Sequence, residues 1–247
     1  MTQTIKYGDH ESQIGDLYIP SRNSLGIVCL FHGGFWKMPY DRFQFDAVAK
    51  ELTEMGYCVW NIEYRKIGES GRVWTDTFTD AIASIQALSS FKDAYSNINI
   101  DNIFVVGHSA GGHLALWLSS QDIGIKCTRF VGLAPILDLR KAFYENIGGD
   151  SVFHLLDGTP EEYPGRYKKA SPIEMLPSSE KQVIFHGVED EDVFVNWSRD
   201  YVSVAKSLGR DIEYIEIEKC RHMEFVDPNS EAFRKFTNWL NEALPNK

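Results

Sequence analysis

Cysteines and positive charges are scarce in this sequence of 247 residues, and it has no long apolar run. Wide spacing of the four cysteines argues against a disulfide framework or a zinc pair and predicts buried thiols at Cys29, Cys58, Cys127 and Cys220. No stretch approaches the roughly 20 apolar residues of a membrane span, and the first residues lack the apolar segment of a signal peptide. We therefore expect a cytoplasmic protein without a membrane anchor.

The charge balance excludes further partners. The sequence has 25 Lys and Arg against 35 Asp and Glu, a formal net charge of −10. Such a chain is poorly suited to nucleic acid or to an anionic membrane surface. It also lacks internal repeats, low-complexity tracts and linkers, so we expect residues 1–247 to form a single domain.

Short β-rich runs alternate with helical patterns along most of the chain. The predicted strands are residues 25–31, 57–64, 102–107, 129–134, 181–187 and 211–218. The predicted helices are residues 41–55, 76–92, 110–121, 195–208 and 229–244. This alternation indicates an α/β protein with a mostly parallel central sheet and helices on both faces.

Two segments depart from this rhythm. The polar start, "IKYGDHESQIGDLYIP", predicts an antiparallel hairpin at one edge of the sheet. Residues 136–180 are rich in proline, glycine and scattered aromatics, and they are too long for a simple connection. Long insertions in compact domains are usually functional, so we expect a short insertion that acts as a lid.

One serine stands where a β-rich run changes to a helical pattern. The segment "GHSAGG", residues 107–112, matches the Gly-x-Ser-x-Gly pattern, in which a sharp strand-to-helix turn projects the serine hydroxyl. Side chains at 107 and 111 would collide across such a turn. The start of the following helix would direct N–H groups toward an oxyanion. Ser109 is therefore the candidate nucleophile.

A serine hydroxyl needs a base to take its proton, and candidates occur later in the chain. The acidic loop after the strand at 181–187 offers Glu189, Asp190 and Asp192, and His222 follows the last predicted strand. In parallel sheets these loops meet at one edge. The order serine, acid, histidine is that of the α/β-hydrolases.

The chain resembles α/β-hydrolase serine esterases, especially small bacterial members similar to arylformamidase (kynurenine formamidase). The motifs that carry the resemblance are "HGGFW" (32–36), "WNIEYRKIG" (60–68), "GHSAGGHLA" (107–115), "HGVEDEDV" (186–193) and "RHMEFVDP" (221–228). The resemblance implies the α/β-hydrolase fold over almost the whole chain. It favours Asp190 as the catalytic acid, with Asp192 and Glu189 as competitors. It also implies an oxyanion hole formed by the N–H groups of Ala110 and of either Gly34 or Phe35.

Other residues of these motifs complete the expected site. Phe35 and Trp36 are bulky for a turn, and we expect them to form the wall of an aromatic substrate pocket. The remaining motif histidines, His32, His113 and His186, are predicted to be hydrogen bonded within packed segments. The sequence contains no metal-ligand spacing and no phosphate loop, so it implies neither a metal nor a cofactor.

The predicted activity is hydrolysis of a small ester or aryl formyl-amide through an acyl-enzyme on Ser109. One alternative is a peptidase of the prolyl oligopeptidase type, although such enzymes usually carry an additional N-terminal domain. Another is a thioesterase, because thioesters pass through the same tetrahedral chemistry. A non-catalytic ligand-binding member of the fold is disfavoured by the intact set of Ser109, Asp190 and His222. The acyl group, the leaving group and the oligomeric state, a homodimer included, are left open.

Overall fold

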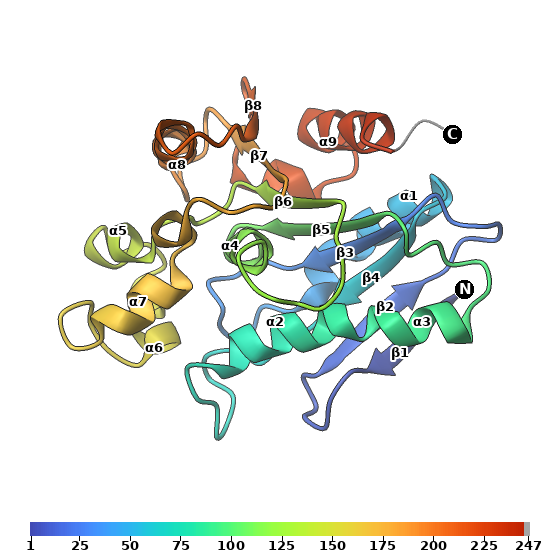
Figure 1. Ribbon diagram of the computed structural model, residues 1–247, viewed down its shortest axis with the longest axis horizontal. Coiled ribbons are helices and arrows are strands. Elements are labelled where there is room, and N and C mark those ends of the chain that lie inside the picture. Colours follow the sequence, from blue (N-terminus) through green and yellow to red (C-terminus); the bar gives the residue numbers. More distant parts are fainter. Residues whose placement is uncertain (245–247) are drawn as a thin grey trace.

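The computed structural model describes residues 1–244, in which eight strands form one sheet covered by helices (Figure 1). The last three residues of the predicted domain, 245–247, lie outside the described part. The strand order is β1-β2-β4-β3-β5-β6-β7-β8. The strands are β1 (Thr2–Lys6), β2 (Ile14–Tyr18), β3 (Ile27–Phe31), β4 (Cys58–Ile62), β5 (Ile103–His108), β6 (Arg129–Leu133), β7 (Gln182–Gly187) and β8 (Glu213–Ile217).

Strands β3 to β8 pair in parallel, and the bounds of each agree within two residues with a strand predicted from the sequence. At one edge β1 and β2 form the predicted antiparallel hairpin, and β2 also pairs antiparallel with β4. The α/β-hydrolase fold class is thereby confirmed. Because the carboxyl ends of parallel strands share an edge, the loops after β3, β5, β7 and β8 converge there.

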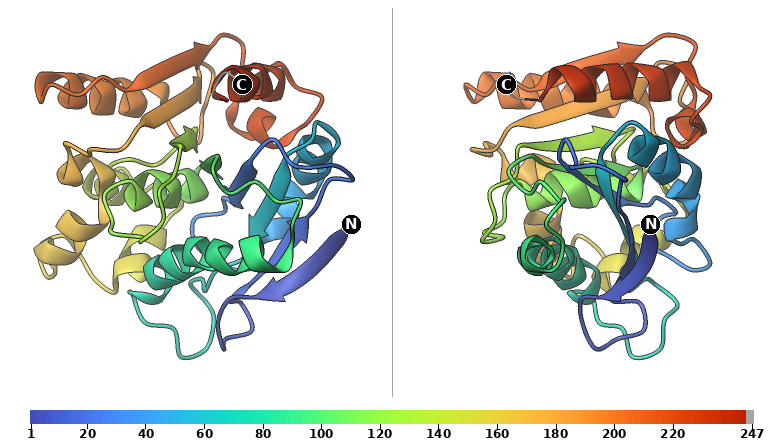
Figure 2. Two further views of the ribbon diagram at one scale, coloured as in Figure 1. Left: turned by 45° about the vertical axis from the view of Figure 1, so that its right-hand side comes forward. Right: turned by 90° about the vertical axis from the view of Figure 1, so that its right-hand side faces the viewer.

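Alternate residues of the central strands supply two separate cores. In β3, Cys29 packs toward one face while Val28 and Leu30 pack toward the other. The first core also receives helices α2 (Asp76–Gln86), α3 (Leu88–Ala94), α4 (Ala110–Leu118) and α8 (Val195–Ser207). The second receives the 3₁₀ helix η1 (Arg42–Phe45), α1 (Asp46–Glu54) and α9 (Glu231–Glu242). Figure 2 shows α1 and α9 on one side of the sheet and α2 and α3 on the other.

The insertion folds as short helices rather than as an extended loop. They are α5 (Leu139–Tyr144), α6 (Ser151–Leu156), α7 (Pro164–Ala170) and the 3₁₀ helix η2 (Pro172–Met175). Leu155, Leu156 and Tyr167 are buried in the first core, whereas Tyr144 and Tyr163 are exposed. The insertion is therefore a packed part of the domain.

The four cysteines are free and buried, as the sequence predicts. The remaining short element, η3 (His222–Val226), follows β8 and begins with a candidate site residue. Within residues 1–244, no helix combines the length and the apolar character needed to cross a membrane.

Candidate active site

Ser109 occupies the sharp turn between β5 and α4 that the sequence predicts. Its backbone has φ 55° and ψ −117°, outside the regions that non-glycine residues normally adopt. A Cβ atom at Gly107 would lie 2.1 Å from the Gly111 carbonyl oxygen, and one at Gly111 would lie 1.9 Å from the Phe31 carbonyl oxygen. Both positions therefore need glycine, and the turn presents Ser109 at the edge of the sheet where the strands end.

His222 and Asp190 are brought together from two different loops. Asp190 Oδ2 lies 2.7 Å from His222 Nδ1, and both side chains are buried. The other oxygen of Asp190 accepts hydrogen bonds from the backbone N–H groups of Asp192 and Val193, each at 2.9 Å. The Asp192 side chain is exposed. The geometry thus pairs His222 with Asp190, the acid that the sequence favoured.

His186 packs behind this pair. Its Nδ1 lies 2.7 Å from Ser198 Oγ, and its Nε2 lies 2.7 Å from the Val193 carbonyl oxygen and 3.3 Å from Asp190 Oδ2. Burial by itself raises the pKa of Asp190, but hydrogen bonds from His186 and His222 outweigh burial and hold that pKa well below its usual range. Asp190 is therefore a carboxylate at neutral pH, and His186 has the hydrogen-bonded role expected for it.

His108, beside the serine, links the turn to the His222 loop. Its Nε2 lies 2.9 Å from the carbonyl oxygen of His222, and the two imidazole rings are 4.5 Å apart. Because a carbonyl accepts, Nε2 carries the proton, and Nδ1 is a buried acceptor without a partner among the described residues. Burial and the nearby His222 lower the pKa of His108 to about 3. The sequence motif contained this residue, but its contact with His222 was not predicted.

The glycine pair after β3 lies directly against the serine. A Cβ atom at Gly33 would stand 3.2 Å from the Ser109 Cβ atom. The Gly33 N–H donates to Gln44 Oε1 at 2.7 Å, so it is already used. Gly34 has φ +102°, and a Cβ atom there would lie 2.2 Å from the Tyr40 side chain. These contacts explain why this loop needs glycine beside Ser109.

The structure corrects the expectation for Trp36, which we placed on the wall of a substrate pocket. Trp36 is fully buried, and its indole N–H lies 3.0 Å from the Ala110 carbonyl oxygen and 3.2 Å from His113 Nδ1. Phe35 and Trp36 both have φ 55°, a left-handed conformation that turns the Trp36 side chain toward α4. Trp36 therefore joins the loop to the serine turn. Phe35, the other predicted wall residue, is half-buried.

His113 and His32 are structural, as expected. His113 Nε2 donates to the Ala170 carbonyl oxygen at 2.8 Å, and burial lowers the pKa of His113 to about 4. His32 Nε2 lies 2.9 Å from Glu63 Oε1, and the His32 ring stacks on Tyr64 with the ring centres 4.4 Å apart. His32 thus anchors the start of the glycine loop, and His113, which accepts from the Trp36 indole, anchors its end.

Glu63 is a buried charge that sequence reasoning missed. Its carboxylate contacts His32, receives the Arg42 N–H at 3.1 Å and pairs with Lys66 at 2.5 Å. Burial raises the pKa of Glu63, but hydrogen bonds and charges from His32 and Lys66 outweigh it and lower the pKa to about 2. The sequence feature that marks Glu63 is its place in the motif "WNIEYRKIG", for which the sequence predicts no role.

Asp190, Asp192 and His222 also offer three possible metal-ligand atoms within 4.8 Å of one another. His222 Nδ1 is already hydrogen bonded to Asp190, and Asp190 Oδ1 accepts two backbone N–H groups. A cation here would have to compete with those bonds. The arrangement is therefore better suited to orienting an imidazole than to holding a metal.

Comparison with solved structures supports the same fold. The chain superposes on a truncated carbohydrate esterase from gut microbiota with a TM-score of 0.83 and 20% identity, covering 98% of this chain and 96% of that one. It also matches an esterase from Thermogutta terrifontis, with a TM-score of 0.76, 19% identity and coverage of 98% and 90%. At these identities the likeness establishes the fold.

The curated relatives are longer proteins, of which this chain matches only a part. The chain is 28% identical to a probable dipeptidyl-aminopeptidase B of Penicillium rubens over 88% of its own length, but spans only 25% of that protein. It is 24% identical to the kynurenine formamidase of Danio rerio, covering 92% of this chain and 77% of the relative. The BD-FAE family model matches residues 16–204, which is most of the chain. With this fold and these relatives, the chain belongs to the BD-FAE family of esterase-like α/β-hydrolases.

Proposed function

We propose that this protein is a serine hydrolase that cleaves small carboxylic esters or aryl formyl-amides through an acyl-enzyme. The observation that carries the proposal is the 2.7 Å contact between His222 and Asp190 in loops adjoining the strained turn at Ser109. In this proposal Ser109 is the nucleophile and His222 the general base. Asp190 fixes the imidazole tautomer and stabilises the imidazolium.

The first half of the reaction forms the acyl-enzyme. Ser109 Oγ attacks the carbonyl carbon while His222 Nε2 takes the hydroxyl proton. The resulting oxyanion is stabilised by the N–H of Ala110, which as the first residue of α4 has no acceptor one turn earlier, and by that of Gly34 or Phe35. His222 then gives its proton to the departing alcohol or amine. The carbon–oxygen or carbon–nitrogen bond breaks, leaving an acyl group on Ser109.

The second half restores the enzyme. Water attacks the acyl carbonyl, and His222 accepts one of its protons. When the second tetrahedral intermediate collapses, the proton returns to Ser109 Oγ and a carboxylic acid leaves. The buried, ionised Asp190 supports both halves, because an imidazolium forms in each of them.

The expected substrate size rests on how Phe35, in the loop beside the serine, is packed. Phe35 packs against the insertion, since a Cβ atom at Gly148 would lie 2.2 Å from the Phe35 ring, and Lys37 Nζ donates to the Gly148 carbonyl oxygen at 3.3 Å. Tyr40 lies edge-on to Phe35 with ring centres 6.5 Å apart. We propose that Phe35 contacts a flat apolar part of the substrate and that the insertion limits its length.

A direct test is covalent labelling of the protein with a fluorophosphonate, followed by intact mass spectrometry and peptide mapping. We expect one adduct on Ser109 and none in Ser109→Ala. The same variant should lose roughly four orders of magnitude in ester turnover. An adduct on another serine, or undiminished hydrolysis by the variant, would contradict the assignment.

A peptidase is the second candidate, because the relative of Penicillium rubens is described as a probable dipeptidyl-aminopeptidase. The same three residues would serve that reaction. A panel of chromogenic esters, thioesters, formyl-anilides and aminoacyl anilides separates the possibilities. Aminoacyl anilide cleavage without ester cleavage would favour the peptidase.

A further inference from the structure

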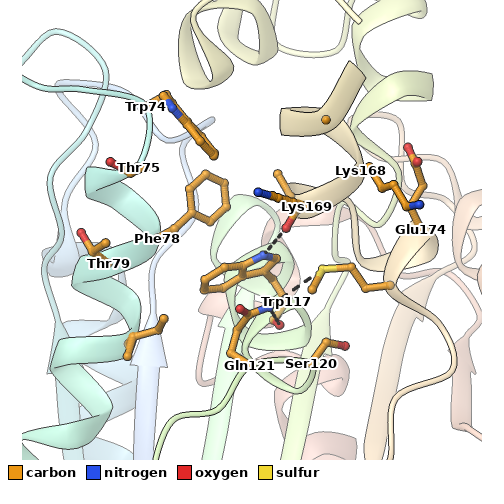
Figure 3. Close-up of a pocket in the computed structure, with 14 residues that line it drawn as sticks. Trp74, Thr75, Phe78, Thr79, Trp117, Ser120, Gln121, Lys168, Lys169 and Glu174 are labelled. Carbon is orange, nitrogen blue, oxygen red and sulfur yellow. Dashed lines mark hydrogen bonds between the residues drawn. The ribbon is translucent and has the colours of Figure 1, made fainter. Parts of the chain in front are cut away.

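We propose that a cavity between α2, α4 and α7 is a second binding site, one that takes a planar aromatic carboxylate. The cavity has a volume of about 730 Å³, and Trp74, Phe78, Trp117, Met175, Lys168 and Lys169 contribute to its wall (Figure 3). Small-molecule sites commonly measure roughly 300 to 1,000 Å³. A smaller cavity of about 340 Å³ adjoins it and shares Trp74 and Lys169.

This cavity is distinct from the candidate active site. Ser109, Asp190 and His222 are not among the described residues that line it. Trp117 stands at the opposite end of α4 from Ser109, a separation of about 12 Å along the helix axis. A molecule seated against Trp117 would therefore occupy the flank of the domain and not the sheet edge where the serine lies.

Three aromatic rings make the cavity suited to a flat ligand. Phe78 and Trp117 are tilted by 55° with ring centres 4.9 Å apart, and Trp74 lies edge-on to Phe78 at 6.2 Å. Figure 3 shows these rings along one side of the cavity, opposite the segment that carries Lys168, Lys169 and Glu174. A planar aromatic ligand would gain offset and edge contacts with rings arranged in this way.

Two polar groups of the cavity wall are already hydrogen bonded. The Trp117 indole N–H donates to the Lys169 carbonyl oxygen at 2.8 Å, and Gln121 Nε2 donates to the Trp117 carbonyl oxygen at 3.4 Å. The part of the wall formed by Trp74, Phe78 and Trp117 therefore favours an apolar ring. A charged or hydrogen-bonding group of the ligand must be recognised at the rim.

Charge at the rim favours an anion. Lys168 and Lys169 are exposed, and neither forms a salt bridge within residues 1–244. Glu174, the acidic residue of the wall, is paired with Arg140 at 2.7 Å. Lys168 and Lys169 therefore give this rim a local positive charge, although the chain as a whole has a net charge of −10. A carboxylate attached to an aromatic ring complements both features.

The test measures binding of 2-naphthoate by isothermal titration calorimetry. We expect one molecule per chain with a dissociation constant below about 1 mM, and weaker binding of the uncharged 2-naphthylmethanol. Ser120→Trp, which fills the cavity, and Trp74→Ala, which removes a partly exposed wall, should each weaken binding at least tenfold. Circular dichroism and thermal melting show whether each variant is folded.

A charge-matched pair of variants tests the rim. Lys168→Gln with Lys169→Gln should weaken 2-naphthoate binding about threefold to tenfold and leave 2-naphthylmethanol binding unchanged. The control, Lys206→Gln with Lys235→Gln, removes the same charge from exposed positions on α8 and α9 and should leave both affinities unchanged. Equal loss in the control would overturn the assignment of the two rim lysines.

Three results would overturn the site itself. The first is no detectable binding of 2-naphthoate. The second is binding that neither Ser120→Trp nor Trp74→Ala weakens, which would place the ligand elsewhere, for example beside Ser109, where it would inhibit ester hydrolysis competitively. The third is a dimer in sedimentation experiments that Ser120→Trp dissociates and that excludes 2-naphthoate, which would make the cavity a contact between two copies.

Discussion

The indole N–H of Trp36 donates to the carbonyl oxygen of Ala110 at 3.0 Å, joining the loop after β3 to the first residue of α4. In the proposed reaction these two segments supply the two oxyanion donors, so this bond fixes their separation. Trp36 and Ala110 are both fully buried, so water would not replace the indole N–H if it were removed.

Trp36→Phe should therefore impair catalysis more than folding. We expect a loss of about 1 kcal/mol in the free energy of unfolding and a fall in kcat of roughly tenfold, with KM little changed. Trp239→Phe is the matched control, because the indole N–H of Trp239, on helix α9, donates to Glu213 of β8 at 2.7 Å. Equal kcat losses in the two variants would argue against a role for Trp36 in positioning the loop.

Asp190→Asn should preserve the fold and lower kcat by roughly four orders of magnitude, since an amide cannot hold the imidazole in the tautomer that accepts from serine. Asp192→Asn should change kcat by less than about threefold, because Asp192 meets Asp190 through its backbone N–H. Steady-state kinetics on a short aryl ester decide between them. A larger effect at Asp192 would transfer the role of the acid to that residue.

The pH profile separates the two neighbouring histidines. With a pKa of about 3, His108 stays neutral from pH 5 to 8, so a change of activity in that window cannot come from its titration. A histidine base predicts a fall of kcat/KM toward acid pH, because an imidazolium cannot accept the serine proton. A flat profile would exclude a histidine base.

His108 itself should act by positioning His222. His108→Gln keeps a donor for the His222 carbonyl oxygen and should retain more activity than His108→Phe, which has none. We expect a difference of about tenfold in kcat/KM, with the midpoint of the pH profile unchanged in both variants. A shifted midpoint would mean that His108 also alters the titration of the base.

Glu63 should make the fold sensitive to acid. Its pKa is lowered from 4.5 to about 2 in the folded chain, so its contribution is present above about pH 4.5 and is lost as the pH falls toward 2. The shift corresponds to roughly 3 kcal/mol. Urea unfolding of Glu63→Gln should therefore show a smaller loss of stability between pH 5 and pH 3 than the unchanged protein. Parallel losses in both proteins would contradict this.

The fold and the central residues of the site were predictable because each has a local signature. Buried parallel strands are continuous apolar runs, and the turn at Ser109 demands Gly107 and Gly111 whatever surrounds it. The position of His222 after the last strand followed from the topology. These inferences needed no knowledge of side-chain packing.

The directions in which side chains point could not be predicted from the sequence. Phe35 and Trp36 are adjacent and both aromatic, yet two successive left-handed residues bury one and leave the other accessible. The contacts of Glu63 with His32 and Arg42 join segments that are distant in the sequence, and no local pattern marks such contacts. The cavity beside Trp117 likewise forms from three separate helices.

The packing of the insertion against the loop beside Ser109 leads us to expect a preference for short acyl groups. Phe35 lies against Tyr40 and against Gly148 of the insertion, in the loop beside the serine. We expect a long acyl chain to meet the insertion, whose displacement would cost buried contacts, whereas a short one would not. We expect kcat/KM for p-nitrophenyl esters to be highest from acetyl to butyryl and to fall steeply by about ten carbons.

Phe35→Ala tests whether this residue sets the limit. Removing the ring should raise KM for butyryl esters and reduce the discrimination against decanoyl esters by about tenfold. Phe43→Ala is the control, because Phe43 is 56% exposed on η1 and should leave the profile unchanged. A preference for palmitoyl over butyryl esters in the unchanged protein would instead indicate a lipase, and the same profile in both variants would remove Phe35 from the substrate site.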